Sequence, residues 1–453
     1  MAEKPGLQTS KLESEAFESL FSDELTNLSN LFENAGYELR MAGGAVRDLL
    51  MGIYPNDIDF ASSATPSQMK EMFEQHKVRM LHKRGEEHGT ITVRMNDTTN
   101  FEITTLRIDF VCDGRRAKVE YTTDWEKDAF RRDLTINSLF LGLDGTIYDY
   151  TGGVDDIQNR RVRFVGKPED RIREDYLRIL RYFRFFGRIG EPAEGHDADT
   201  LAAIIANREG MDTLSGERIW AEMKRIVGGR NGASVLRTML LECGLGKHIG
   251  LPNVTEEILK EFSQVFETSV DHSDDEETSC AESMTLLSTL FRTDSDLSQF
   301  HRRNKVSNNE KALAQFIMRY REAAADEKNK DDKRFFFRLV TDQWHLYGST
   351  DMEINKIRAI ELLKYINSYN LIVDMQEWTV PKLPINGVNL MEAGVERGVK
   401  FKYMLQHMYI LWRDSDYSLT LDELLTHIDD DIVIPDEKIP VLRGPNSKRR
   451  RLS

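Results

Sequence analysis

The sequence predicts an α+β protein, in which a mixed sheet with helices is followed by a remainder made only of helices. Short runs that favour strands are confined to residues 37–150. From Glu169 onward the apolar residues recur at helical spacing, as Leu177, Leu180 and Phe183 do. A chain of 453 residues is too long for one compact core, so we expect several domains.

The first third of the chain contains the candidate strands. They cover residues 37–42, 57–62, 89–95, 101–107 and 139–150, with a helix at 66–75 between the second and the third. The first thirty or so residues are polar, and we expect a frayed end followed by a helix. The turn at Thr151, Gly152 and Gly153 marks the end of the mixed region.

Composition and charge restrict the classes of function. Hydrophobic residues make up 40% and charged residues 30% of the chain, which is typical of a soluble, folded protein. No stretch approaches the ~18 to 20 apolar residues of a membrane span, so we expect no membrane insertion. The net charge is −15, but residues 159–189 contain ten Lys or Arg against four Asp or Glu. Phosphate binding needs only such a local excess, so the overall charge does not exclude a nucleic-acid partner.

The two ends of the chain bear on its location. The first residues resemble neither a secretory signal nor a transit peptide, so we expect a cytoplasmic protein. A mitochondrial form would need an upstream start that adds a targeting segment. The basic run at 448–451 is either a nuclear signal, a tail that contacts RNA, or a solvated basic end.

Gly43 and Gly44 directly follow the first candidate strand. Two glycines there let a ligand approach the backbone and expose amide N–H groups to an anion. Arg47 lies in the first turn of the helix that we expect next, where a guanidinium can meet a phosphate. Taken alone, a double glycine is more typical of a plain strand–turn–helix connection.

Asp57 and Asp59 lie in the second candidate strand. Residues i and i+2 of a strand point to the same face, so the two carboxylates project together and repel each other. A divalent cation relieves this repulsion, and magnesium takes carboxylate and phosphate oxygens readily. The alternative is an edge strand with solvated acids, but the glycine turn just before the pair favours a metal site. Glu102, in the fourth candidate strand, is either a third carboxylate or a solvated glutamate.

Residues 131–137 read RRDLTIN and form the next candidate site element. Arginines pair with phosphates in forked geometry, and Asp or Asn can hydrogen-bond ribose hydroxyls. Arg132 and Asp133 are therefore candidate nucleotide-binding residues. A capped helix with a surface arginine pair would have a similar sequence.

Residues 174–184 predict a helix that can select a base. Asp175 and Arg178 are three residues apart and so neighbours on a helix, and Arg181 and Arg184 continue along the same side. A carboxylate accepts hydrogen bonds, whereas a guanidinium donates them. Cytosine and adenine share one donor–acceptor order and uracil and guanine the reverse, so this pair accepts C and A without a nucleic-acid template. The alternative is an amphipathic helix with an ion pair and a solvated basic stripe.

Five motifs in this order resemble the class II tRNA nucleotidyltransferases, the CCA-adding enzymes. They are GGAVRD with DIDF, RRDLTIN, DYTGGVDD, EDYLRILRYFRF and SGERIWAEM, within residues 37–245. The segment at 112–128 resembles eukaryotic members, including a flexible loop that the family uses in switching from CTP to ATP. The resemblance implies addition and repair of the 3′-terminal CCA of tRNA with CTP, ATP and magnesium.

The resemblance also implies an architecture and a set of site residues. A polymerase-β-like nucleotidyltransferase head would be followed by a helical neck, body and tail in a seahorse-shaped molecule. We place an N-terminal extension at 1–28, the head at 29–150, the neck at 151–245, the body at 246–375 and the tail at 376–453. Asp57 and Asp59 would be the metal ligands, and Glu217 and Arg218 would brace the neck helices. The implied nucleotide-binding residues are Gly44, Arg47, Arg132, Asp133, Asp175, Arg178, Arg181 and Arg184.

Two other functions are compatible with parts of the sequence. A poly(A) polymerase of the same superfamily shares the head motifs, although the intact Asp175 and Arg178 pair favours CCA addition. A catalytically silent RNA-binding scaffold would not need both Asp57 and Asp59. The acidic run at 267–282 is expected to be a loop between helices and is assigned no function.

Overall fold

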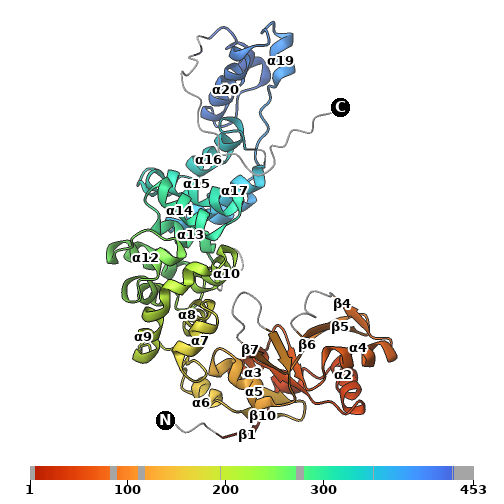
Figure 1. The fold of residues 1–453 in the computed structure, drawn as a ribbon. Helices are drawn as coiled ribbons and strands as arrows, with labels where there is room; N and C mark the ends of the chain where they lie inside the picture. Colours follow the sequence, from red (N-terminus) through yellow and green to blue (C-terminus); the bar gives the residue numbers. More distant parts are fainter. Residues whose placement is uncertain are drawn as a thin grey trace. The chain divides into compact units, whose positions relative to one another are not determined.

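A computed structural model describes residues 6–81, 89–110, 118–193, 195–271, 280–349, 351–430 and 432. The chain divides into two compact units, Met1–His248 and Ile249–Ser453 (Figure 1). The finer division into extension, head, neck, body and tail stays a prediction. No helix in the described ranges is both long enough and apolar enough to cross a membrane.

The first unit contains an eight-stranded sheet with the order β1-β10-β9-β2-β3-β6-β5-β4. Its strands are β1 (Gln8–Lys11), β2 (Leu39–Ala42), β3 (Asp59–Ser62), β4 (Arg79–Leu81), β5 (Thr90–Met95), β6 (Thr99–Thr105), β9 (Phe140–Gly142) and β10 (Thr146–Asp149). β3 and β6 run parallel, and the other neighbouring strands of this sheet run antiparallel. The predicted mixed sheet is therefore confirmed. A separate ribbon pairs β7 (Arg107–Phe110) with β8 (Lys118–Tyr121).

Each predicted strand region contains at least one strand, and the last contains the hairpin β9–β10, which turns at Gly145 with a φ of 82°. The frayed end expected at the N-terminus is wrong from residue 8 onward, because β1 pairs with β10. All four β1 residues are exposed, so no apolar alternation marks this strand in the sequence. Lys11 also donates to Asp144 at 2.8 Å, which fixes the strand at the edge of the sheet.

Helices pack on the sheet and hold its site-bearing strands. They are α1 (Glu15–Glu18), α2 (Asp23–Asn34), α3 (Gly44–Leu50), α4 (Pro66–Gln75) and α5 (Trp125–Arg131). The helix predicted at 66–75 is confirmed, and Thr65 and Gln68 form a capping box at its start. Phe60 of β3 meets Phe101 of β6 edge-on at 5.7 Å between ring centroids, so buried aromatic packing fixes these two strands side by side.

After β10 the described residues form helices and turns but no further strand, as predicted. The first unit continues with α6 (Gly153–Gln158), α7 (Pro168–Glu174), α8 (Leu177–Ile189), α9 (Ala198–Asn207), α10 (Gly216–Val227) and α11 (Gly232–Arg237). The apolar side of α8, which includes Leu180, Phe183 and Phe186, is buried. The opposite side of α8 carries arginines and is free to serve the site.

The described residues of the second unit form helices and turns, and its buried apolar side chains include two clusters. Its helices are α12 (Glu256–Asp271), α13 (Ser283–Leu287), α14 (Asp294–Asn304), α15 (Asn308–Ala325), α16 (Lys333–His345), α17 (Met352–Tyr365), α18 (Ile372–Glu377), α19 (Gly387–Glu392), α20 (Val399–Asp414) and α21 (Leu421–Leu425). One cluster surrounds Phe336 and Leu362, and the other surrounds Met408 and Trp412.

The acidic run at 267–282 is only in part the loop that we expected. α12 continues to Asp271, because Phe266 and Ser269 keep its buried face in register. Residues 272–279 of this run lie outside the described residues, as do the basic run at 448–451 and residues 111–117 of the predicted flexible loop.

Candidate active site

Three carboxylates lie at one end of the β3–β6 pair. Asp59 begins β3, and the parallel register places it beside Glu102 of β6. Asp57 lies two residues earlier and outside the strand, so the strand predicted at 57–62 is too long at its start. Partial loss of hydration raises the pKa of Asp59, and the negative charges of Glu102 and Asp57 raise it further, whereas Arg132 lowers it. The fold therefore concentrates negative charge at this strand end.

These carboxylates fit a divalent cation that is shared with a substrate. Among the described residues, no group of three or more His, Cys, Asp or Glu side chains could hold a metal ion by itself. An ion such as Mg²⁺ commonly takes one or two carboxylates and completes its shell with substrate phosphate and water. Burial and the charges of Glu102 and Asp57 raise the pKa of Asp59 more than Arg132 lowers it, and a cation bound there would favour the ionised carboxylate.

The glycine turn connects β2 to α3 beside this charge. Gly43 has a φ of 66°, which an L side chain rarely adopts, and a Cβ there would lie 3.2 Å from Nη1 of Arg132. Arg47, one turn into α3, is 4% exposed. Its Nη1 donates to Oδ1 of Asn137 at 2.5 Å and its Nη2 to Oδ1 of Asp48 at 2.9 Å. Arg47 thus lies behind the turn, and its predicted phosphate contact stays a prediction.

Arg132 and Asp133 are consecutive residues of the RRD motif, but different neighbours hold their side chains. Nε and Nη2 of Arg132 both donate to Oδ2 of Asp128 at 3.1 Å, and Nη1 donates to the carbonyl oxygen of Asn137 at 3.2 Å. Asp133 is buried and accepts from Nε of Arg181 at 2.5 Å. Burial alone would raise the pKa of Asp133, but the ion pair with Arg181 holds it below its ordinary value.

Asp175 and Arg178 lie at the junction of two helices rather than within one helix. Asp175 ends α7 and α8 begins at Leu177, so the predicted continuous helix is wrong at this point. Oδ2 of Asp175 accepts from Arg218 at 2.7 Å, whereas Arg178 pairs with Glu174. Within the described residues, these two pairings take the place of the ion pair between Asp175 and Arg178 that the alternative interpretation expected. The backbone still joins them, since N–H of Arg178 donates to the carbonyl oxygen of Asp175 at 3.0 Å.

One arginine of α3 and two of α8 converge on the ring of Phe185. The guanidinium carbons of Arg47, Arg181 and Arg184 lie 4.9, 5.6 and 4.8 Å from the ring centroid of Phe185. Nη1 of Arg184 also donates to both carboxylate oxygens of Glu222 at 3.3 Å. A ring face and a carboxylate allow several cations to share a half-buried space.

The structure brings together most of the predicted residues and adds supports that the sequence did not single out. Asp128, Asn137, Phe185, Glu222 and Asp48 are the added residues. Asp48, Asn137, Phe185 and Glu222 stand inside quoted motifs, and Asp128 ends the quoted segment at 112–128, which was the available signal. Asp128, Glu222 and Asp48 act through helical or tertiary neighbours, and spacing alone does not distinguish them from solvated acids.

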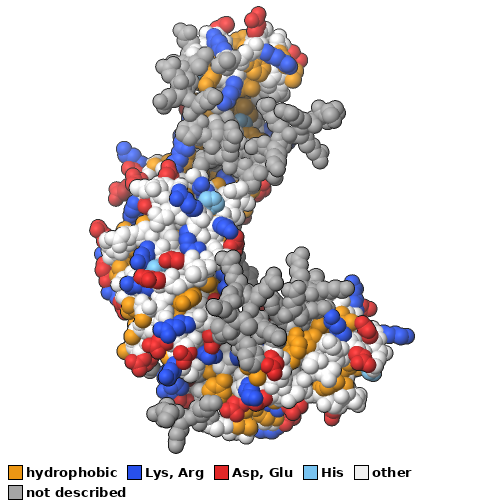
Figure 2. Space-filling view, in the orientation of Figure 1, with side chains coloured by type: hydrophobic (Ala, Val, Ile, Leu, Met, Phe, Trp, Pro, Cys, Tyr) orange, Lys and Arg blue, Asp and Glu red, His pale blue; other side chains and the backbone are white. Residues whose placement is uncertain are grey.

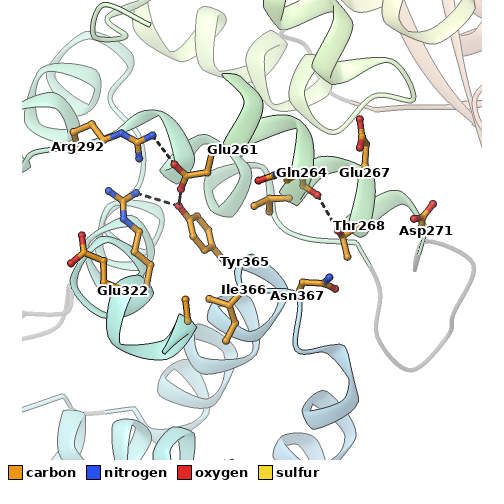
Figure 3. A pocket seen from close by; sticks show the side chains of 13 residues that line it. Glu261, Gln264, Glu267, Thr268, Asp271, Arg292, Glu322, Tyr365, Ile366 and Asn367 are labelled. Atoms are coloured by element: carbon orange, nitrogen blue, oxygen red, sulfur yellow. Dashed lines mark hydrogen bonds and ion pairs between the residues drawn. The ribbon is translucent and has the colours of Figure 1, made fainter. Parts of the chain in front are cut away.

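A separate cleft of about 890 Å³ lies within the second unit (Figure 3). Nη2 of Arg292 donates to Oε2 of Glu261 at 2.6 Å, and Tyr365 donates to the other carboxylate oxygen. Arg321 donates to the Tyr365 hydroxyl at 3.2 Å, and burial raises the pKa of Tyr365. These contacts tie α12, α15 and α17 together. The cleft contains none of the predicted site residues.

Comparisons with known proteins show which family the chain is similar to. Residues 39–163 match the family model described as the poly A polymerase head domain. The chain is 44% identical to "CCA tRNA nucleotidyltransferase 1, mitochondrial" of Mus musculus over 93% of each chain, and 44% identical to the Homo sapiens protein of that name over 94% of each. The fold resembles a crystal structure of Bacillus stearothermophilus CCA-adding enzyme in complex with CTP, with a TM-score of 0.70, 24% identity and coverage of 92% of this chain and 97% of that one.

Proposed function

Since the chain belongs to the class II CCA tRNA nucleotidyltransferases, we propose that it completes the 3′ end of tRNA with CCA, taken from CTP and ATP without a nucleic-acid template. In each step the 3′-hydroxyl oxygen of the tRNA forms a bond to the α-phosphorus of the nucleotide. The bond from that phosphorus to the bridging oxygen of the β-phosphate breaks, and pyrophosphate leaves. The observation that carries the proposal is the cluster of carboxylates at the β3–β6 strand end, within reach of the Arg132 charge.

Asp57 and Asp59 would hold the magnesium ion, and Glu102 would act as the third carboxylate of the site. A bound ion would supply positive charge where the transferred phosphoryl group and the leaving pyrophosphate gain negative charge. The negative charge of Glu102 raises the pKa of its neighbour Asp59, so the two carboxylates together would attract a cation more strongly than either alone. These residues would also be the nearest acceptors for the proton that the 3′-hydroxyl loses.

Arginines and backbone amides would position the nucleotide. Arg132 is anchored by Asp128 and stands next to the Gly43 turn, so its charge is directed toward the phosphate side of the site. Gly44 offers backbone N–H groups without a side chain in the way. Asp133 and Arg181 form an ion pair, and each keeps further hydrogen-bonding capacity. The carboxylate could accept from a ribose hydroxyl, and the guanidinium could donate to a phosphate. Arg184 would act from the same face of α8.

Base choice would come from Asp175 and Arg178. Arg218 fixes the Asp175 carboxylate but leaves it acceptor capacity, since each carboxylate oxygen has two lone pairs. Arg178 is fixed by Glu174 and by the carbonyl oxygens of Arg171 and Arg131 at 3.1 and 3.2 Å. A rigid acceptor beside a rigid donor penalises a base that presents the reverse order, because its groups would stay unpaired.

One assay tests the proposal against the poly(A) polymerase alternative, which the family model of the head alone leaves open. The protein is incubated with tRNA that lacks its CCA end and with CTP, ATP or both. Addition of three nucleotides only when both are present supports the proposal. A long run of A from ATP alone would contradict it, and no addition at all would favour the RNA-binding scaffold.

Location stays a proposal as well. We propose a cytoplasmic location, with the nucleus as an alternative, whereas the mouse and human relatives carry "mitochondrial" in their names. Imaging of the protein with a C-terminal fluorescent tag, expressed from its own locus, would decide between these compartments.

A further inference from the structure

The first unit has a second cleft, at the sheet edge formed by β4. It has a volume of about 490 Å³ and is lined by residues of α2, the end of α4, β4 and the β5–β6 turn. None of the residues of the candidate active site lines it. Figure 2 shows Lys and Arg side chains, interspersed with Asp and Glu, at this end of the sheet, where Figure 1 labels β4.

Two arginines oppose each other in this cleft. β4 pairs with β5, and the register places Arg79 directly opposite Arg94. Like charges that are directly opposite on antiparallel strands destabilise a sheet. Arg94 donates from Nε to the neutral side chain of Asn100 at 2.9 Å. Arg79 is exposed and makes no hydrogen bond or ion pair with any described residue, so its charge is left uncompensated.

The rest of the lining adds positive charge and amide groups. Lys77 follows α4 and is exposed, as Arg79 is, whereas Arg94 is half-buried. Asp97 is the one acid among the described residues that line the cleft. The opposite wall carries Asn27, Asn30 and Asn34 of α2, whose spacing places them on one helix face. Each of these amides can both donate and accept hydrogen bonds. In a chain with a net charge of −15, such a cleft selects an anionic ligand with polar groups around it.

We propose that this cleft binds the phosphate backbone of RNA, at a site distinct from the site of nucleotide transfer. A guanidinium fork matches phosphate oxygens, and successive phosphates of one strand can neutralise both opposed arginines at once. The asparagine row offers partners for ribose 2′-hydroxyls, which an acidic polypeptide lacks. The RNA is either the tRNA substrate or a separate RNA, and the arms of the test distinguish these sources.

The test compares the full-length wild-type protein with the double variant R79Q/R94Q. The control is K127Q/R160Q, which removes two charges from side chains of the same unit that are 60% and 54% exposed and lie outside this cleft. Affinity for tRNA that lacks CCA, and for an unstructured single-stranded RNA of equal length, is measured by fluorescence anisotropy between about 50 and 200 mM salt. Two lost phosphate contacts should lower the slope of log affinity against log salt by about 1.4 to 1.8.

Each outcome decides the proposal. A lower slope for tRNA alone in R79Q/R94Q identifies the substrate as the ligand, and a lower slope for both RNAs identifies single-stranded RNA in general. Equal slopes in R79Q/R94Q and the control would overturn the proposal. The melting temperature of R79Q/R94Q should equal or exceed that of the wild type, because the variant removes a repulsion. CCA addition at saturating tRNA should keep its rate, so failure here leaves the proposed function untouched.

Discussion

Replacing Asp128 with alanine should destabilise the head and weaken nucleotide use together. The carboxylate is 1% exposed, and it accepts from N–H of Arg107 at 3.1 Å, from Nε of Arg131 at 2.8 Å and twice from Arg132 at 3.1 Å. Alanine removes this partner from two guanidinium groups whose side chains are only 17% and 18% exposed. Breaking a buried ion pair costs about 3–5 kcal/mol of stability. Because the two arginines have some access to water, we expect D128A to lose about 3 kcal/mol.

Asp124→Ala on the same helix is the matched control. Asp124 caps α5 by accepting from N–H of Lys127 at 3.2 Å, and loss of a cap costs about 1 kcal/mol. Urea unfolding should therefore separate the two variants by about 2 kcal/mol. D128A should also lose about tenfold or more in kcat/KM for CTP, since a misplaced Arg132 that costs about 1.4 kcal/mol of transition-state binding gives that factor.

Two results would refute this reasoning about Asp128. One is an equal loss of stability in D128A and D124A, and the other is full catalytic efficiency in D128A. The pH dependence gives a further check. Burial opposes ionisation of Asp128, but Arg132 and Arg131 hold its pKa below the ordinary value, so its contribution is complete above about pH 4. The difference in stability between wild type and D128A should shrink only as the pH falls below that value.

Three further outcomes follow from the site. Asp57→Ala should abolish nucleotide transfer while the Kd for tRNA stays within about twofold of the wild-type value, and an unchanged rate would remove the metal assignment. Arg178→Ala should raise incorporation of UMP and GMP relative to CMP and AMP by about tenfold, which competition assays on tRNA ending at its discriminator base can measure; unaltered discrimination would end the argument for base selection. Phe185→Leu should raise the KM for CTP several-fold, because three arginines lose the ring that they share. Phe185→Tyr keeps an aromatic ring and should keep the KM near the wild-type value. Phe186→Leu, on the buried side of α8, should reduce stability alone, and equal kinetic effects of the two leucine variants would contradict a positioning role for Phe185.

The sequence was most informative where chemistry and periodicity coincide. The strand region around Glu102 could be placed because apolar and polar residues alternate there, with Phe101 and Ile103 buried. The strand that begins at Asp59 has no such alternation, since its three remaining residues are all buried. The helix at 66–75 carried its own start signal in Thr65 and Pro66. By contrast, β1 and β4 are short edge strands with exposed residues, and their backbone pairing has no counterpart in the side-chain pattern.

The pairing of charges was harder to predict than the charges themselves. Asp175 and Arg178 are three residues apart, so a mutual ion pair was the alternative to a base-selecting pair, but a helix break at Asp175 turns the carboxylate toward Arg218 of α10. Arg47 was expected to reach outward, yet Asp48 and Asn137 draw it inward. Such choices depend on tertiary neighbours, and a single sequence does not reveal which of several nearby acids lies within hydrogen-bonding distance.

The parallel register of β3 and β6 links the activity of the protein to its correct folding. Asp59 stands beside Glu102, and Phe60 beside Ile103, so the same pairing builds the charged site and the buried core. A slip by one residue would turn the outward acids inward and expose Ile103 to water, because side chains alternate between faces. A head with this error would be both inactive and unstable. Catalytic competence therefore reports on correct folding, and cellular degradation of unstable chains would also remove the enzymatically dead ones.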